Sequence, residues 1–203
     1  MWLVYIMVLL SFLIGSFPTG YIIVKKYHGF DIRTKGSGNI GSTNVKRVAG
    51  SKAATITQVI DIAKGIIPMV IAIAIYSYNK LPIDIYSFLS LVAIAAVLGH
   101  NYTPFLGFRG GKGVNTTLGA FIFIAPIPVF LGIMVHTLLK KAIPIVAVRS
   151  ILLGVTIAIA AILLSLPSPV IYACIASALI MTIRHKKNIK ELLEEKRKKK
   201  YLN

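Results

Sequence analysis

The sequence predicts an all-α integral membrane protein with seven transmembrane segments, an N-terminus outside and a C-terminus in the cytoplasm. Of its 203 residues, 56% are hydrophobic and only 14% are charged, which is less charge than a soluble domain carries. Apolar stretches approach or exceed the roughly 20 residues that cross a bilayer. Basic residues gather between these stretches, and cytoplasmic loops of membrane proteins concentrate Lys and Arg.

The apolar stretches define the expected spans. The first is interpreted as a spanning helix rather than a secretory signal, because its basic residues, Lys25 and Lys26, follow it. Basic clusters in 25–52, in 109–112 and after Arg184 mark the cytoplasmic side, whereas the turn at 79–82 has only Lys80 and suits the outside. The stretches are 2–24, 53–78, 83–99, 114–139, 143–165 and 168–184.

One of these stretches is expected to be two segments. An even number of spans would leave both termini on one side, which contradicts the charges. Pro126 and Pro128 interrupt stretch 114–139, and proline removes a backbone donor and breaks a helix. The resulting segments, 114–125 and 128–139, are too short to cross at full thickness and predict a re-entrant or thinned hairpin. The alternative is five spans, with 114–139 as one helix and either 143–165 or 168–184 not crossing.

The chain is expected to form a single polytopic domain, residues 1–190, followed by a basic cytoplasmic tail, residues 191–203. Its one cysteine, Cys174, excludes an internal disulfide and a Cys-rich metal site. The net charge of +17 is interpreted as topological, and as attraction for anionic lipid or a phosphate-bearing substrate. No nucleic-acid partner, metal or cofactor is expected.

A first glycine-rich segment follows the first span. Successive glycines let backbone N–H groups converge on an anion, and the flanking Lys35, Lys46 and Arg47 add positive charge. The spacing also fits a dinucleotide fingerprint, but no strand precedes it, so that interpretation is rejected. The segment therefore predicts a phosphate cradle, with a plain flexible loop as the alternative. Its cradle residues are Gly36, Ser37, Gly38, Asn39, Gly41, Thr43 and Asn44.

A second glycine-rich segment reads GHNYTPFLGFRGGKGVNTT over residues 99–117. Leu106 and Gly113 occupy the wrong places for a Walker A loop, so nucleotide hydrolysis is not supported. The turn instead opens an apolar helix at Val114, whose free N–H groups suit an anion, with Lys112 as a point charge. The alternative is that the basic residues only set topology. The candidate residues are His100, Gly110, Gly111, Lys112 and Gly113.

A third segment, RHKKNIK at 184–190, lies where the last span leaves the membrane. His185 and Asn188 are three residues apart, so on a helix they share one face. A basic run at this position is common in membrane proteins, and topology alone is the competing explanation.

Charged residues inside the apolar stretches are costly and are usually paired or functional. Asp61 and Lys64 are spaced i,i+3 and are interpreted as a structural ion pair. Arg149 is expected to extend its head group to the cytoplasmic surface, and the neighbouring Ser150 is a candidate to hydrogen-bond substrate. His136 is interpreted as structural.

These segments resemble one known family, the bacterial acyl-phosphate-dependent glycerol-3-phosphate acyltransferases of the PlsY type. The matching strings are Gly36–Arg47, Asp61–Gly65, Gly99–Gly119 and Arg184–Ile189. The resemblance implies a seven-helix enzyme of the cell inner (plasma) membrane with its active site facing the cytoplasm. It implies transfer of a fatty acyl group from acyl phosphate to the 1-hydroxyl of glycerol 3-phosphate. The products are lysophosphatidic acid and phosphate, in the first step of phospholipid synthesis.

The chain departs from this family in two places. The family usually has a serine-rich run at the start of the penultimate helix, where only Ser150 is a hydroxyl here. Asn115 stands where a small residue is common. We expect a monomer in membrane lipid, with acyl phosphate and glycerol 3-phosphate as its substrates.

The chemistry agrees with the resemblance. No His-x4-Asp pair, serine elbow or reactive cysteine is present, so an acyl-enzyme is not expected. Acyl phosphate is a mixed anhydride, whose reaction needs positioning and charge stabilisation more than a strong nucleophile. The expected catalytic residues are Ser37, Arg47, Lys112, His185 and Asn188, and the expected substrate-binding residues are Gly36, Gly38, Asn39, Gly41, Thr43, Asn44, His100, Gly110, Gly111, Gly113 and Ser150.

Three questions stay open at this point. The resemblance suggests that a substrate phosphate takes the proton of the hydroxyl, with His185 or His100 as the alternative base. A transporter or channel for a small phosphate-bearing anion would also use half-helix N-termini. An acyltransferase acting on another polyol phosphate is the third possibility.

Overall fold

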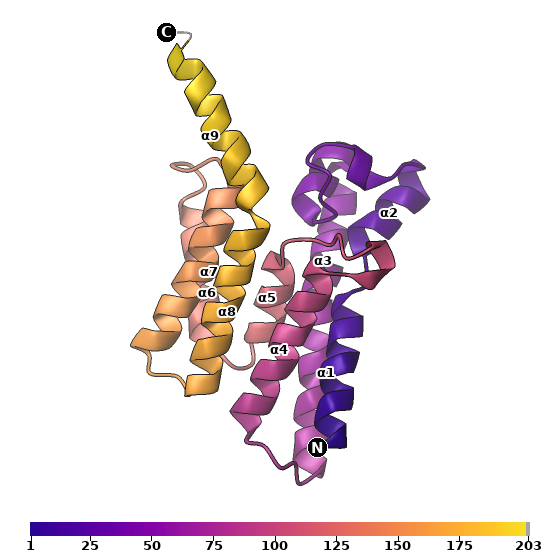
Figure 1. Ribbon diagram of the computed structural model, residues 1–203, viewed down its shortest axis with the longest axis vertical. Coiled ribbons are helices and arrows are strands. Elements are labelled where there is room, and N and C mark those ends of the chain that lie inside the picture. Colours follow the sequence, from indigo (N-terminus) through magenta and orange to yellow (C-terminus); the bar gives the residue numbers. More distant parts are fainter. Residues whose placement is uncertain (202–203) are drawn as a thin grey trace.

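Helices account for all the regular secondary structure in the described part of the chain (Figure 1). The computed structural model describes the backbone of residues 1–201 and the side chains of residues 1–194. The elements are α1 (Trp2–Gly15), α2 (Thr19–His28), η1 (Ile32–Thr34), α3 (Ser42–Tyr78), α4 (Ile85–Asn101), η2 (Pro104–Leu106), α5 (Val114–Phe121), α6 (Pro126–Leu138), α7 (Val146–Leu163), α8 (Ser168–Arg184) and α9 (Lys186–Tyr201).

Within the described residues, four helical segments are long and apolar enough to cross a membrane. They are Trp2–His28, Ser42–Tyr78, Ile85–Leu106 and Val146–Leu163, and α8 with the start of α9 forms a fifth, bent by 45°. The shorter α5 and α6 have 8 and 13 residues and pack inside the bundle. The N-terminus and the end of α9 lie at opposite ends of the molecule (Figure 1).

The expected interruption of stretch 114–139 is present. Helix α5 ends at Phe121, and α6 begins at Pro126. Proline suits the first position of a helix because its missing N–H would have no partner there. The two short helices are therefore separate elements, as the two prolines predicted.

Two other boundaries differ from the prediction. The first span breaks at Ser16–Pro18, between α1 and α2, where Pro18 cannot continue the backbone hydrogen bonding of α1. Helix α3 begins at Ser42 rather than near residue 53, so it extends beyond its apolar part and carries basic residues on its first turns. It bends at Gly50, whose φ is 84°. Hydrophobicity alone located the apolar parts of these helices but not their ends.

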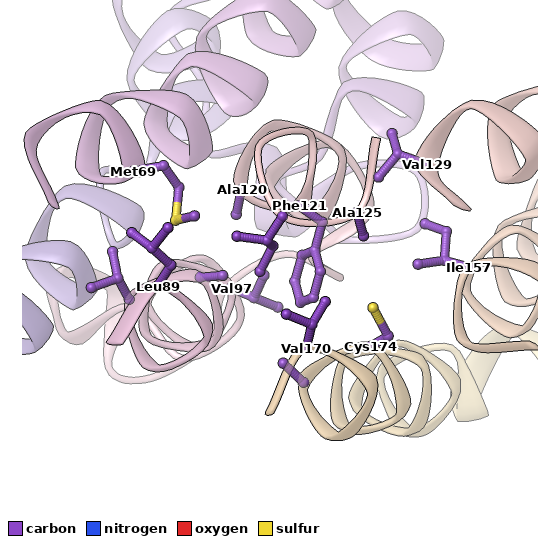
Figure 2. Close-up of a cluster of buried hydrophobic side chains, with 14 of the residues drawn as sticks. Met69, Leu89, Val97, Ala120, Phe121, Ala125, Val129, Ile157, Val170 and Cys174 are labelled. Carbon is purple, nitrogen blue, oxygen red and sulfur yellow. The ribbon is translucent and has the colours of Figure 1, made fainter. Parts of the chain in front are cut away.

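The main core lies where α4, α5 and α8 meet α3, α6 and α7 (Figure 2). Phe121, at the end of α5, is fully buried at its centre, among Val97, Val170 and Cys174. Lipid is as apolar as these side chains, so close packing rather than water exclusion holds such helices together. The short α5 is thereby fixed among its neighbours.

Small residues let the helices that carry the site approach closely. Gly65 of α3 faces the backbone of Thr116 and Gly119 of α5, and Gly119 faces Ile62 in return. A side chain at either glycine would overlap the opposite backbone. This contact sets the start of α5 directly beside the middle of α3.

The charged residues inside the bundle are buried and bonded. Lys64 Nζ lies 3.1 Å from Asp61 Oδ1 and donates to the carbonyl oxygen of Phe17, at the break between α1 and α2, at 2.7 Å. This geometry agrees with a structural ion pair. The expectation for Arg149 was wrong: its guanidinium does not extend to the surface but is buried, and donates to the carbonyl oxygen of His136 at 3.0 Å.

Candidate active site

A cavity of about 530 Å³ opens between four segments that are distant in the sequence. These are the first glycine-rich loop with the start of α3, the start of α5, the start of α7, and the junction of α8 with α9. All four lie toward the end of the bundle that carries the C-terminus (Figure 1). Its lining includes most of the residues expected from the sequence: Ser37, Asn39, Gly41, Thr43, Asn44, Arg47, His100, Lys112, Gly113, Ser150, His185 and Asn188.

The other four expected residues, Gly36, Gly38, Gly110 and Gly111, do not line the cavity. They shape the loops behind it. Gly36 has a φ of 59°, and a Cβ there would overlap the side-chain oxygen of Asn44. Only glycine satisfies both conditions.

Asn44 organises the first loop from inside. Its Oδ1 accepts from the N–H of Ser37 at 2.9 Å, and its Nδ2 donates to the carbonyl oxygens of Lys35 and Asn39 at 3.1 and 2.9 Å. The side chain is buried, and both of its N–H donors are used within the protein. Asn44 therefore acts on the cavity by fixing the loop that carries Ser37 and Asn39.

The second loop is fixed by backbone contacts with the end of α4. The N–H of Gly110 donates to the carbonyl oxygen of Asn101 at 3.2 Å, and the N–H of Gly111 donates to that of His100 at 2.9 Å. These two N–H groups are therefore used within the fold. The part of this segment that does line the cavity is Lys112, Gly113 and the first turn of α5.

Lys112 is the half-buried cation of the cavity wall, and its ammonium donates to Oδ1 of Asn188. The pKa of Lys112 is lowered to about 8, chiefly because the ammonium is buried; Glu191 raises it, and the positive charges of Arg184 and Arg47 lower it. Arg47, near the start of α3, and Lys112, in the second loop, both line the cavity, so two distant segments deliver positive charge to one space. Such a space suits an anion with more than one negative charge.

His185 is a neutral hydrogen-bonding group in this wall. Its Nδ1 lies 2.8 Å from the carbonyl oxygen of Met181; a carbonyl only accepts, so Nδ1 carries the proton and Nε2 keeps its lone pair. Burial lowers the pKa of His185 to about 4, and Lys112 lowers it as well, although the contact with Met181 raises it. In the protein alone this imidazole is a weak base.

His100 is buried in the last turn of α4. Its Nδ1 lies 3.8 Å from Oδ1 of Asp61. On its other side the imidazole abuts Gly111, where any Cβ would overlap it. His100 thus joins the ion pair of α3 to the second loop.

Sequence reasoning missed part of the lining. The apolar wall at 144–147 carries no polar signal, and His136 resembles any other residue of a spanning helix. Asn115, at the start of α5, donates to the hydroxyl of Ser42 at 3.2 Å and so links the two loops directly. The unpredicted lining residues are Ser42, Gln58, Asp61, Val114, Asn115, His136, Pro144, Ile145, Val146, Ala147, Glu191 and Leu192.

Comparison with known proteins gives one consistent result. A family model described as glycerol-3-phosphate acyltransferase matches residues 5–195. A glycerol-3-phosphate acyltransferase of Clostridium acetobutylicum is 53% identical over 97% of this chain and 99% of its own. One from Synechococcus elongatus is 39% identical, over 91% of this chain and 88% of its own. The chain belongs to the glycerol-3-phosphate acyltransferase family.

Solved structures of this family have the same fold. Crystal structures of PlsY (YgiH), an integral membrane glycerol 3-phosphate acyltransferase, are similar in a glycerol 3-phosphate form and in a lysophosphatidic acid form. The first has a TM-score of 0.84 at 32% identity and covers 95% of this chain and 92% of its own. The second has a TM-score of 0.81 at 31% identity, with the same coverage. The resemblance seen in the sequence motifs is confirmed, and the chain is a multi-pass member of a membrane enzyme family that serves phospholipid synthesis.

Proposed function

We propose that this protein transfers a fatty acyl group from acyl phosphate to the 1-hydroxyl of glycerol 3-phosphate. The products are lysophosphatidic acid and inorganic phosphate. One observation carries the proposal: Arg47, near the start of α3, and Lys112, in the second glycine-rich loop, bring positive charge to one cavity that also has an apolar wall at 144–147. Two phosphate groups and the start of an acyl chain need this combination. Family membership and the two ligands in the similar crystal structures support it.

In this mechanism the phosphates of acyl phosphate and glycerol 3-phosphate would repel each other, and the two cations hold them close together. The 1-hydroxyl oxygen attacks the carbonyl carbon of the acyl phosphate, and the bond from that carbon to the phosphate oxygen breaks. The leaving group is inorganic phosphate, so no acyl-enzyme is formed. Lys112 and Arg47 stabilise the negative charge that develops. Ser37, Asn39, Ser150 and His185 orient the reactants, with Asn188 holding the ammonium of Lys112.

We infer that a substrate phosphate takes the proton of the attacking hydroxyl. A phosphate monoester has a second pKa of about 6, whereas the pKa of His185 is about 4 because the ring is buried. A base works best when its pKa lies near the operating pH. His185 is therefore better suited to accept a hydrogen bond at Nε2 than to remove the proton.

We also propose the membrane arrangement. Residues 1–190 form one acyltransferase domain with seven membrane segments in the plasma membrane, followed by the basic tail 191–203, and the protein works as a monomer. The N-terminus is outside, and the cavity and the C-terminus face the cytoplasm. The basic clusters at the cavity end of the bundle support this orientation. The end of the tail, residues 202–203, lies outside the described residues.

The test is an end-point assay on purified protein in a lipid-like phase. Glycerol 3-phosphate is offered with palmitoyl phosphate or with palmitoyl-coenzyme A, while free phosphate and lysophosphatidic acid are followed. We expect product from palmitoyl phosphate alone. Product from the coenzyme A ester would contradict the donor assignment. A parallel arm with other polyol phosphates tests the acceptor, and no product in any arm would direct attention to anion flux in sealed vesicles.

A further inference from the structure

Arg184, the last residue of α8, reaches the loop that carries Lys112. Its Nε donates to the carbonyl oxygen of Gly111 at 3.1 Å, and its Nη2 donates to that of Gly110 at 3.0 Å. The guanidinium also lies over the ring of Tyr102, 5.0 Å from its centroid. The planar fork of arginine can bridge two successive carbonyls and stack on an aromatic face, which a lysine ammonium does not reproduce.

The same two glycines are held from the opposite side by α4. Their N–H groups donate to the carbonyl oxygens of His100 and Asn101, and His100 leaves no room for a Cβ at Gly111. Both the donors and the acceptors of this short piece of backbone are therefore engaged. Arg184 supplies the contacts to the two carbonyl oxygens. The residue that follows Gly111 in the chain is Lys112.

The side chain of Lys112 also contacts the junction of α8 with α9. Its ammonium donates to Asn188, which lies on the first turn of α9, four residues after Arg184. His185, the residue directly after Arg184, lines the cavity beside them. The junction of α8 with α9 thus holds the loop by its backbone and Lys112 by its ammonium.

We propose that Arg184 is a positioning residue for Lys112: it holds the backbone of Gly110 and Gly111 so that the ammonium meets the substrate phosphate beside His185. The proposal rests on the proposed function, in which Lys112 binds a phosphate. Charge does not explain the placement, because the cation of Arg184 repels that of Lys112 and lowers its pKa. The geometric gain has to outweigh this repulsion.

The experiment compares two variants at Arg184 with a matched charge control. Arg184→Gln removes the charge and the fork, whereas Arg184→Lys keeps the charge and loses the fork. Lys187→Gln removes one positive charge from an exposed position of α9, where Lys187 pairs with Glu191. The measurements are kcat and KM for glycerol 3-phosphate with palmitoyl phosphate, their pH profiles, and thermal unfolding of each variant.

We expect Arg184→Gln to lower kcat/KM by about a hundredfold, the size of loss that a misplacement near 1 Å produces. The alkaline limb of its kcat/KM pH profile should move to higher pH, because the positive charge of Arg184 no longer lowers the pKa of Lys112. Arg184→Lys should regain only part of the activity and keep the alkaline limb where it is. Lys187→Gln should match the unchanged protein.

A purely structural role predicts a different pattern. In a Lys112→Ala background, Arg184→Gln should add little further loss if it acts through Lys112; an undiminished loss overturns the proposal. A folded Arg184→Gln with full activity also overturns it. If Arg184→Gln does not fold, Arg184→Lys carries the test, and full activity in that variant overturns the proposal.

Failure of the proposed function would give a different result: the protein without any substitution would make no product from palmitoyl phosphate. In that case the probe is inorganic phosphate, titrated into the unchanged protein and Arg184→Gln by calorimetry. At least tenfold weaker binding by Arg184→Gln supports the positioning role, and equal binding overturns it.

Discussion

The two glycine-rich loops of the cavity are similar in composition but are held in different ways. The first loop is organised locally, by the side chain of Asn44 a few residues further along the chain. The second is held by the end of α4, which is 9 and 11 residues away along the chain, and at long range by Arg184, which is 73 and 74 residues away from the carbonyls it contacts. Glycines shape both loops. The first loop is fixed by a side chain close in the sequence, whereas the second also depends on a side chain from a distant helix.

This difference has consequences for the site. The hydrogen bonds that Asn44 makes to the first loop need only the start of α3, because they span at most nine residues. The second loop needs α4 and α8 to be packed before Lys112 is placed. We therefore expect substitutions that disturb helix packing to affect Lys112 more than the first loop.

The largest effect is expected from Asp61→Asn, because Asp61 belongs to the buried ion pair of α3. It pairs with Lys64, which holds the break between α1 and α2, and its carbonyl oxygen accepts from Thr116 of α5 at 3.0 Å. The substitution leaves a buried ammonium without its carboxylate, which costs about 3–5 kcal/mol of stability. Thermal unfolding in detergent measures it, with Asp61→Leu/Lys64→Met as the control that removes both charges. Activity lost with stability intact would show that Asp61 acts in the chemistry instead.

Lys112→Ala isolates the second loop. We expect kcat/KM for glycerol 3-phosphate to fall by about 100- to 1000-fold, the usual cost of removing one group that stabilises developing charge. Phosphate release at sub-saturating glycerol 3-phosphate measures it. Full activity in this variant would remove the main argument for a phosphate site at this loop.

Asn44→Ala isolates the first loop. It removes three hydrogen bonds from a buried side chain, and a buried group left without a partner costs about 1–3 kcal/mol. We expect kcat/KM to fall by about ten- to a hundredfold with Arg184 and Lys112 still in place. The control is Lys52→Ala, at an exposed position about two turns further along α3. Equal losses in both variants would mean that the loop does not depend on Asn44.

The pH dependence tests the charge shared between the loops. Burial lowers the pKa of Lys112 to about 8, so the ammonium is present below this pH and is lost above it. We expect kcat/KM to fall about tenfold per pH unit above pH 8, since this quantity reports the free enzyme. In Lys112→Arg the cation persists, and the alkaline limb near pH 8 should disappear. A limb that stays in Lys112→Arg belongs to another group.

The smallest effect is expected from Asn115→Ala, which removes the hydrogen bond between the loops. A single partly buried hydrogen bond contributes about 1 kcal/mol, so kcat/KM should fall less than about tenfold, with KM and kcat both measured. A much larger loss would mean that the loops depend on each other rather than on their separate supports.

Much of this arrangement could be predicted from the sequence. The charge pattern and the two prolines predicted the separate α5 and α6, and the residues singled out in the sequence supply half of the cavity lining. The resemblance to the family was confirmed. These features are local, because glycines, prolines and charged residues act on their own stretch of chain.

The remainder depends on contacts that no local pattern encodes. The contact of Arg184 with Gly110 and Gly111 joins two segments on different helices, and a basic residue at a membrane edge gives no sign of it. The N–H groups of these glycines are engaged by α4, which no local pattern indicates. The apolar wall at 144–147 looked like ordinary membrane sequence. The break before α2 was hidden because hydrophobicity continues across Pro18.

The most direct test of the central claim is whether Arg47 and Lys112 act on one bound phosphate. Glycerol 3-phosphate is titrated by calorimetry into the unchanged protein, Arg47→Gln, Lys112→Gln and the double variant. If both cations face one site, binding relieves their repulsion, so the second substitution costs less than the first, with a coupling above about 0.5 kcal/mol. Losses that add within about 0.5 kcal/mol would contradict the account and place the two cations at independent sites.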